Sequence, residues 1–92
     1  MVGGGEGAFI GAVHRIAARM DGEIELCCGA FSRSAERSIA SGKALYLDEE
    51  RCYATYQAMF EQEARRSESD GMDMVVIVTH NHVHFPVAKM AL

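Results

Sequence analysis

The sequence predicts an α/β fold, in which a parallel sheet is covered by helices on both faces. Turn signals divide the 92 residues into alternating strand-like and helix-like segments. A run of glycines over residues 3–7 stands where the first strand would pass into the first helix. Residues 74–79 (MVVIVT) form a continuous apolar, β-branched run, which is typical of a strand buried on both faces.

The first half of the chain predicts a helix followed by a strand. After the glycines, apolar residues recur at steps of three and four, as on one face of a helix: Ile10, Val13, Ala17 and Met20. Gly22 ends this helix, because glycine adopts the left-handed conformation of a helix C-terminus. Residues 23–31 are predicted to be the second strand, with alternate side chains on one face.

The middle of the chain predicts two further helices. Ser34 is a suitable N-cap for a short helix that ends at Gly42. Residues 51–54 predict a brief strand, and Thr55 caps the helix after it. The charged residues of that helix and its end are expected to form an exposed face: Glu61, Glu63, Arg65 and Arg66.

The last part of the chain predicts the fourth strand and a final helix. Residues 80–84 would form the loop at the carboxyl end of strand 74–79, and Pro86 suits the first turn of a helix over residues 87–92. Only two residues precede the glycines, and no capping signal follows the last helix. We therefore expect residues 1–92 to be a partial Rossmann-type domain, incomplete at both ends, with strand order 3-2-1-4.

Composition excludes several classes of protein. Nine basic and thirteen acidic residues leave a net charge of -4, and no Lys/Arg block predicts a nucleic-acid surface. The longest apolar run, residues 74–78, is too short to span a bilayer, and the start lacks the pattern of a signal peptide. A cytoplasmic location is expected. The three cysteines lack the spacing of a zinc site and are interpreted as buried, reduced side chains.

The glycine run carries the first chemical prediction. Glycines allow a tight turn and a close approach to a pyrophosphate, whose charge the free N–H groups at a helix start attract. The spacing departs from G-x-G-x-x-G, because counting from Gly3-x-Gly5 the third glycine comes three residues late, at Gly11. A flexible turn without a ligand is the alternative. No Gly-Lys-Ser/Thr sequence closes the run, so it is not a P-loop.

The end of the second strand bears on the choice of cofactor. A site for NAD usually has Asp or Glu there to hold the adenosine ribose. Ser32 and Arg33 stand at this place instead, and arginine suits a 2′-phosphate. This slightly favours NADP over NAD. An Arg33 side chain that only faces solvent beside the N-cap is the alternative.

Three histidines at alternate positions, His80, His82 and His84, follow the fourth strand. In an extended segment they would point the same way and could converge on a zinc ion, although no carboxylate or cysteine follows at ligand spacing. A loop at the carboxyl end of a buried strand is also where a cofactor would lie. We favour cofactor contact and helix capping over a metal site.

Two stretches together resemble one family. Residues 3–15 (GGGEGAFIGAVHR) and 74–88 (MVVIVTHNHVHFPVA) are similar to the opening and the strand-four motif of the glucose–fructose oxidoreductase / inositol dehydrogenase / rhizopine catabolism (Gfo/Idh/MocA) family. The resemblance implies a site that binds the pyrophosphate and the adenosine ribose of the cofactor and that also lines it on the side of strand four. Its residues would be Gly3, Gly5, Gly7, Ala8, Phe9, Ile10, Ser32, Arg33, Thr79, Asn81 and His84. His80 stands where the family usually has proline.

The resemblance also implies what lies outside the chain. The family's Glu-Lys-Pro segment and its substrate domain, with the catalytic residues, would follow Leu92. The parent would be a homo-oligomeric oxidoreductase that transfers a hydride between NAD(P) and a sugar- or polyol-like alcohol or carbonyl, and these 92 residues alone would be inactive. Two alternatives are a stand-alone nucleotide-binding module without catalysis and a metal-dependent hydrolase that uses His80, His82 and His84.

Overall fold

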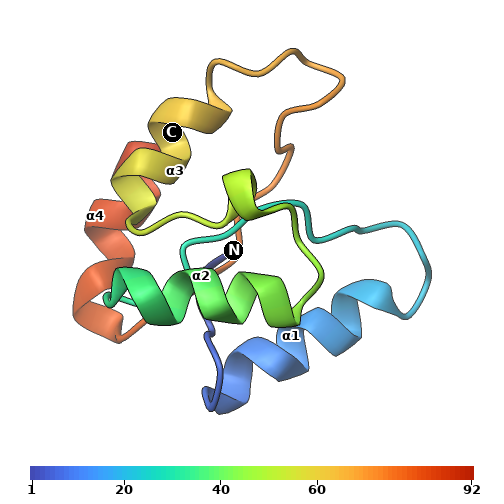
Figure 1. Ribbon diagram of the computed structural model, residues 1–92, viewed down its shortest axis with the longest axis vertical. Coiled ribbons are helices and arrows are strands. Elements are labelled where there is room, and N and C mark those ends of the chain that lie inside the picture. Colours follow the sequence, from blue (N-terminus) through green and yellow to red (C-terminus); the bar gives the residue numbers. More distant parts are fainter.

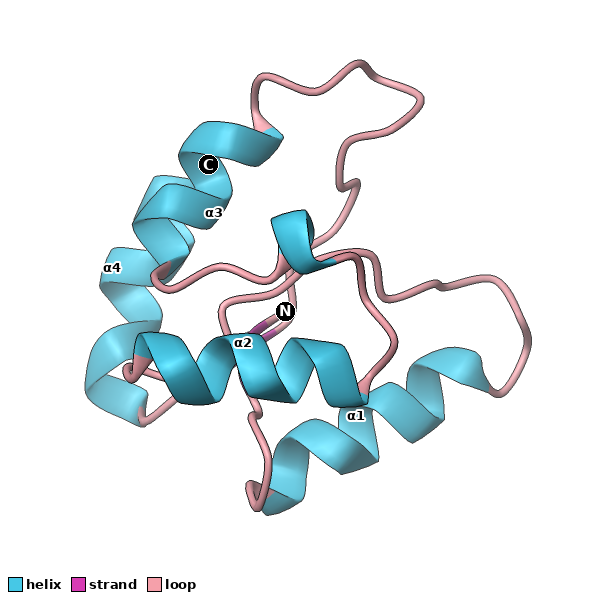
Figure 2. Ribbon diagram, in the orientation of Figure 1, coloured by secondary structure: helices cyan, strands magenta, loops and turns pink.

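The computed structural model describes all residues from Met1 to Leu92 (Figure 1). Helices and loops make up nearly all of it, and the strands are very short (Figure 2). The elements, in chain order, are β1 (Val2–Gly3), α1 (Phe9–Arg19), α2 (Ala35–Ala44), the 3-10 helix η1 (Glu49–Arg51), α3 (Tyr56–Glu63), β2 (Ile77–Val78) and α4 (Asn81–Ala91).

The sheet is parallel and has the predicted strand order. β1 pairs with β2 in parallel, with Val2 opposite Ile77. On its other side Val2 forms a parallel bridge to Ala30, and Gly29 forms a second parallel bridge to Cys52. The segments therefore lie in the order Cys52, 29–30, β1, β2, which is the order 3-2-1-4 of a Rossmann-type sheet. The predicted fold class is confirmed.

The strands are shorter than predicted. Residues 23–31 pair only at Gly29 and Ala30, and in the region 51–54 only Cys52 makes a bridge, directly after η1. Strand 74–79 contracts to β2, whose residues are half-buried instead of covered on both faces. The reason is that β2 is an edge strand in this sheet, since its only partner is β1.

Two of the predicted N-caps are confirmed. The Ser34 hydroxyl accepts a hydrogen bond from the Arg37 N–H, and the Thr55 hydroxyl accepts one from the Ala58 N–H. α2 continues two residues past Gly42, which the sequence predicted to be its end. Gly42 instead allows close packing, because a Cβ at this position would stand 2.2 Å from the Cys52 Sγ.

The last helix differs most from the prediction. α4 begins at Asn81, so residues that were predicted to form a loop are its first turn, and Pro86 lies inside the helix. His80 is the N-cap residue, and its carbonyl accepts a hydrogen bond from the Val83 N–H at 3.0 Å. Pro86 lacks only the N–H that would point to the His82 carbonyl, and the helix continues past it.

The core lies where the short strands meet α3 and α4, two helices that pack side by side (Figure 1). Its buried members are Val2, Cys28, Ala30, Tyr53, Met59, Phe60 and Val87. The cysteines are free thiols, and Cys27 is only half-buried. No helix combines the length and the apolar character needed to cross a bilayer.

Glu63 contradicts the prediction of an exposed charged face, since only 3% of it is accessible. Arg51 donates to both of its carboxylate oxygens, from Nε at 3.0 Å and from Nη2 at 2.6 Å, and the Tyr53 hydroxyl donates at 2.7 Å. Burial acts to raise the pKa of Glu63, but these donors outweigh it and hold the pKa below its ordinary value. The ion pair fastens η1 to α3.

Candidate functional site

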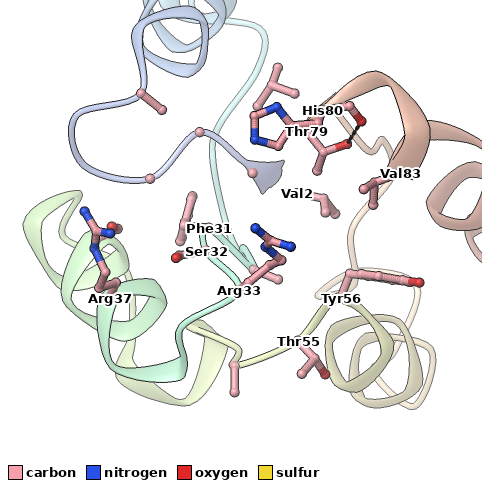
Figure 3. A pocket seen from close by; sticks show the side chains of 18 of the residues that line it. Val2, Phe31, Ser32, Arg33, Arg37, Thr55, Tyr56, Thr79, His80 and Val83 are labelled. Atoms are coloured by element: carbon pink, nitrogen blue, oxygen red, sulfur yellow. Dashed lines mark hydrogen bonds between the residues drawn. The ribbon is translucent and has the colours of Figure 1, made fainter.

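A cleft of about 690 Å³ lies at the carboxyl ends of the parallel segments (Figure 3). Its walls come from the glycine turn, the residues after Ala30, the start of α3 and the residues that join β2 to α4. The carboxyl edge of a parallel sheet, at the point where the strand order reverses, is where α/β proteins bind ligands.

All four α-helices begin at this cleft, so their positive ends point toward it. α2 and α3 satisfy their first N–H groups with the hydroxyls of Ser34 and Thr55. The N-cap residues of α1 and α4, Ala8 and His80, provide no such side-chain cap. The uncapped helix starts at the cleft can therefore bind an anion.

The glycine turn requires glycine for two separate reasons. Gly3, Gly4 and Gly7 have φ values of 82°, 72° and 83°, in the left-handed region that other residues rarely adopt. A Cβ on Gly3 would also stand 2.9 Å from the Val78 carbonyl oxygen, and one on Gly11 would stand 2.5 Å from the Gly4 Cα. The late glycine of the motif thus performs the close helix–strand packing of the third glycine in G-x-G-x-x-G.

Part of the turn's backbone is held by the protein and part is free. The Gly5 N–H donates to the Phe31 carbonyl at 3.1 Å, and the Glu6 N–H donates to the Ser41 hydroxyl at 3.0 Å. The N–H groups of Gly7, Phe9 and Ile10 donate to no acceptor in the protein. The turn is therefore anchored on one side and presents open donors at the start of α1.

Arginines dominate the charge on the second wall. Ser32 and Arg33 line the cleft as predicted, and Arg37 from the first turn of α2 joins them (Figure 3). Glu6 is the only carboxylate among the lining residues. The sequence prediction missed Arg37, although its place three residues after the Ser34 cap puts it at the start of the helix, near the predicted ribose site.

The residues after β2 are arranged differently from the prediction. Thr79 lines the cleft, but Asn81 and His84 do not. The His84 Nε2 lies 2.9 Å from the Thr79 carbonyl oxygen, so this side chain closes the turn between β2 and α4. His80, His82 and Val83 line the cleft in their place. The sequence favoured cofactor contact for the three histidines, and His80 and His82 do line the cleft. His84 does not, because residues 81–91 are helical and the alternation of a strand does not hold there.

The three histidines do not converge. The rings of His80 and His82 stack with their centroids 6.1 Å apart, whereas His84 turns to the Thr79 carbonyl. No group of three His, Cys, Asp or Glu side chains in the structure is arranged to hold a metal ion. The juxtaposition on which a hydrolytic metal site would depend is therefore not formed.

Seven of the eleven predicted binding residues line the cleft: Gly3, Gly5, Ala8, Ile10, Ser32, Arg33 and Thr79. Gly7, Phe9, Asn81 and His84 lie outside it, and Phe9 is 82% exposed. The cleft also contains residues from the start of α3 that the prediction left out, namely Thr55, Tyr56 and Gln57. The only sequence signal near these residues was the helix cap at Thr55, which marks the start of α3 but not its position beside the cleft. The strand before α3, which could have indicated that position, is reduced to a single bridge at Cys52.

The structure has a parallel sheet of order 3-2-1-4, a glycine turn leading into an uncapped helix, and a cleft at the carboxyl ends of the strands. Together these features define an incomplete Rossmann-type fold, a class that commonly binds dinucleotides at this place. No family model matches the chain. Several individual proteins, however, match it closely.

The protein named uncharacterized oxidoreductase YfiI of Bacillus subtilis (strain 168) is 45% identical over 93 residues, which cover 100% of this chain and 23% of that protein. An oxidoreductase from Pseudomonas syringae is 48% identical with a TM-score of 0.93, over 99% of this chain and 24% of that one. An inositol dehydrogenase homolog from Azotobacter vinelandii, solved with NADH and myo-inositol, is 43% identical with a TM-score of 0.94, over 99% and 24%.

The chain is therefore similar to proteins named as oxidoreductases and to an inositol dehydrogenase homolog, in agreement with the family resemblance predicted from the sequence. It spans about a quarter of the length of the proteins it matches. The resemblance in the two sequence motifs is confirmed.

Proposed function

We propose that residues 1–92 are the cofactor-binding part of an NAD(P)-dependent oxidoreductase, and that a nicotinamide dinucleotide occupies the cleft. The observation that carries this proposal is the glycine turn with open N–H groups at the uncapped start of α1. A pyrophosphate there would receive hydrogen bonds from the backbone and would be attracted by the helix dipole. The Azotobacter homolog solved with NADH supports the choice of ligand.

The residues on the walls of the cleft suggest where the adenosine half and the nicotinamide half of the dinucleotide would lie. Ser32 and Arg33, at the end of the second strand segment, would hold the adenosine ribose. Thr79, at the end of β2, would lie on the nicotinamide side. The bound cofactor supplies the hydride chemistry, while the protein binds and orients it. The free backbone N–H groups of Gly7 and Phe9 would donate to the pyrophosphate, whereas Asn81 and His84 would support the site from outside the cleft.

The charge of the second wall suggests that a 2′-phosphate is accepted. Arg33 and Arg37 line this wall, and it has no carboxylate that would bind the free ribose hydroxyls of NAD. Guanidinium groups suit phosphate because they can form paired hydrogen bonds to it. We therefore infer that NADP(H) binds at least as tightly as NAD(H).

The substrate and the catalytic residues are proposed for the longer parent protein and not for residues 1–92. Inositol dehydrogenase homologs suggest a sugar- or polyol-like alcohol or carbonyl as the substrate class. A substrate domain outside residues 1–92 would supply the catalytic side chains, and the parent would be a homo-oligomer. Within these 92 residues we assign binding roles only.

The proposal is tested with Ala8→Asp, titrated with NAD⁺, NADH, NADP⁺ and NADPH by calorimetry. Aspartate is a good N-cap, so it should stabilise α1 while its carboxylate occupies the free N–H groups and repels a pyrophosphate. The matched control is Ser34→Asp, which places the same residue at the N-cap of α2. We expect the Ala8 variant to lose binding of all four cofactors and the control to retain binding of NAD⁺ and NADH. Failure of the unsubstituted chain to bind any dinucleotide, or unchanged binding by Ala8→Asp, would refute the proposal.

A further inference from the structure

Two histidine rings form a stacked pair on the wall of the cleft that follows β2. The centroids of His80 and His82 lie 6.1 Å apart, and their planes differ by only 8°. Both residues line the cleft and are exposed to solvent. The Thr79 hydroxyl donates to the His80 carbonyl at 3.3 Å, and this hydrogen bond links the backbone of His80 to the residue that follows β2. Neither ring makes a hydrogen bond within the protein.

The pair lies on the opposite side of the cleft from Arg37. Figure 3 shows His80 beside Thr79 on one wall of the cleft and Arg37 at its far side, on α2. If the dinucleotide is bound as proposed above, on which this inference rests, the adenosine lies near Ser32 and Arg33 and the nicotinamide lies on the side of Thr79. The histidine pair is then the titratable group on the nicotinamide side.

We propose that the protonation of the His80–His82 pair sets the relative affinity of the cleft for the oxidised and the reduced cofactor. The nicotinamide ring carries a positive charge in NAD(P)⁺ and none in NAD(P)H. An imidazolium on the same wall repels the first and not the second. A charge on one ring of the pair is enough for the effect.

The other charged or titratable groups of the cleft are not expected to reproduce this pH dependence. They are Glu6 on the glycine turn, Arg33 and Arg37 at the start of α2, and Tyr56 on α3. Carboxyl, guanidinium and phenol groups ordinarily keep one charge state between pH 5.5 and 8, whereas histidine changes its charge there. His84, on the same helix, is turned to the Thr79 carbonyl and does not line the cleft.

The size of the effect follows from Coulomb's law. Two unit charges about 6 Å apart change a dissociation constant by roughly threefold in water and by roughly 100-fold at an effective dielectric constant of 20. Since both rings are exposed, the lower end applies. We expect the ratio of the dissociation constants of the oxidised and reduced cofactors to rise about 3- to 10-fold from pH 8.0 to pH 5.5.

The experiment measures this ratio by calorimetry on the 92-residue chain at both pH values, with NAD⁺ and NADH and with NADP⁺ and NADPH. Both redox forms carry the same phosphates, so effects of pH on phosphate binding cancel in the ratio. The double variants are His80→Asn with His82→Gln, and His80→Pro with His82→Ala. The controls are His14→Ala and His14→Gln, at an exposed histidine of α1 that does not line the cleft, and far-ultraviolet circular dichroism checks that each variant is folded.

The expected result is a ratio that depends on pH in the unsubstituted chain and in both controls, and that loses this dependence in the folded double variants. Tight binding with a ratio independent of pH would overturn the inference and leave the proposed function intact. So would a dependence that survives in the double variants. Absence of any dinucleotide binding would overturn both.

Discussion

Gly11 of α1 lies directly against Gly4 of the glycine turn, so that a Cβ on Gly11 would stand 2.5 Å from the Gly4 Cα and 2.9 Å from its carbonyl oxygen. The same carbonyl accepts a hydrogen bond from Arg15 at 2.8 Å. Backbone contact of this kind cannot be relieved by a change of rotamer. The position of α1, and with it the open end that faces the cleft, depends on this pair of glycines.

Gly11→Ala is therefore predicted to destabilise the protein. At an exposed helix position this change would stabilise by about 1 kcal/mol, because alanine is the better helix former. Here we expect the free energy of unfolding to fall by about 1–3 kcal/mol, since the methyl group must displace the turn. Urea denaturation measures the change. A rise in stability would show that the turn can move aside. As a control, Ala17→Gly on the exposed side of α1 measures the difference in helix propensity between alanine and glycine in this helix.

The buried carboxylate gives a second prediction. Glu63→Gln removes the buried counter-charge of the Arg51 guanidinium, which is only 9% exposed, and leaves it the exposed Asp70 carboxylate at 3.8 Å. The free energy of unfolding should fall by up to about 3–5 kcal/mol. Glu61→Gln, two residues earlier on α3 and exposed, is the matched control and should change it by less than about 0.5 kcal/mol. Equal effects of the two changes would contradict a stabilising role for the ion pair.

The same carboxylate predicts a loss of stability in acid. Folding lowers the pKa of Glu63, so its contribution is fully present above the unfolded value of about 4.3 and disappears as the pH falls through the lower, folded value. Urea midpoints between pH 3 and pH 7 should fall at the acid end. The slope should be smaller in Glu63→Gln and unchanged in Glu61→Gln; parallel curves for all three proteins would exclude this group as the cause.

Two buried serines on α2 should separate binding from folding. The Ser41 hydroxyl accepts from the Glu6 N–H and anchors the glycine turn, so Ser41→Ala should weaken dinucleotide binding about 3- to 10-fold. The Ser38 hydroxyl accepts from the Phe31 N–H at 2.8 Å and donates to the Tyr53 carbonyl at 2.5 Å. Ser38→Ala should mainly lower the free energy of unfolding, by about 1–3 kcal/mol. Calorimetry and urea denaturation of both variants check this division.

Arg33→Ala tests the preference for the 2′-phosphate. Loss of a charged hydrogen bond to phosphate should weaken NADP(H) about 10- to 100-fold and change the affinity for NAD(H) by less than about threefold. Arg65→Ala, an exposed arginine just after α3, is the control for net charge. If both cofactors lose affinity equally, Arg33 contacts a part of the dinucleotide that they share.

Much of the fold was predictable because its signals are local. The glycine run, the caps at Ser34 and Thr55, and the β-branched run before Thr79 each act within a few residues of the chain. The parallel sheet followed from the alternation of such segments. Local signals could not place the end of α2, because Gly42 is kept inside the helix by its contact with Cys52, ten residues away.

The candidate site was predicted less completely than the fold. The glycine turn, Ser32, Arg33 and Thr79 were named because a motif marks them. Arg37 and the start of α3 carry no motif, and they line the cleft only because the segments at Ala30 and Cys52 lie side by side. Asn81 and His84 lie outside the cleft because their segment, which was expected to be a loop, is the first turn of α4.

The amino-acid sequence by itself determined that the chain alternates between strand and helix, where three of its helices begin, and that a glycine turn precedes the first of them. Tertiary structure alone decided that Glu63 is buried against Arg51, and that His80 and His82 face a cleft whose other walls come from α2 and the start of α3. The physical reason is distance along the chain. Turns and caps are settled by neighbouring residues, whereas burial and the direction of a side chain depend on segments that only folding brings together.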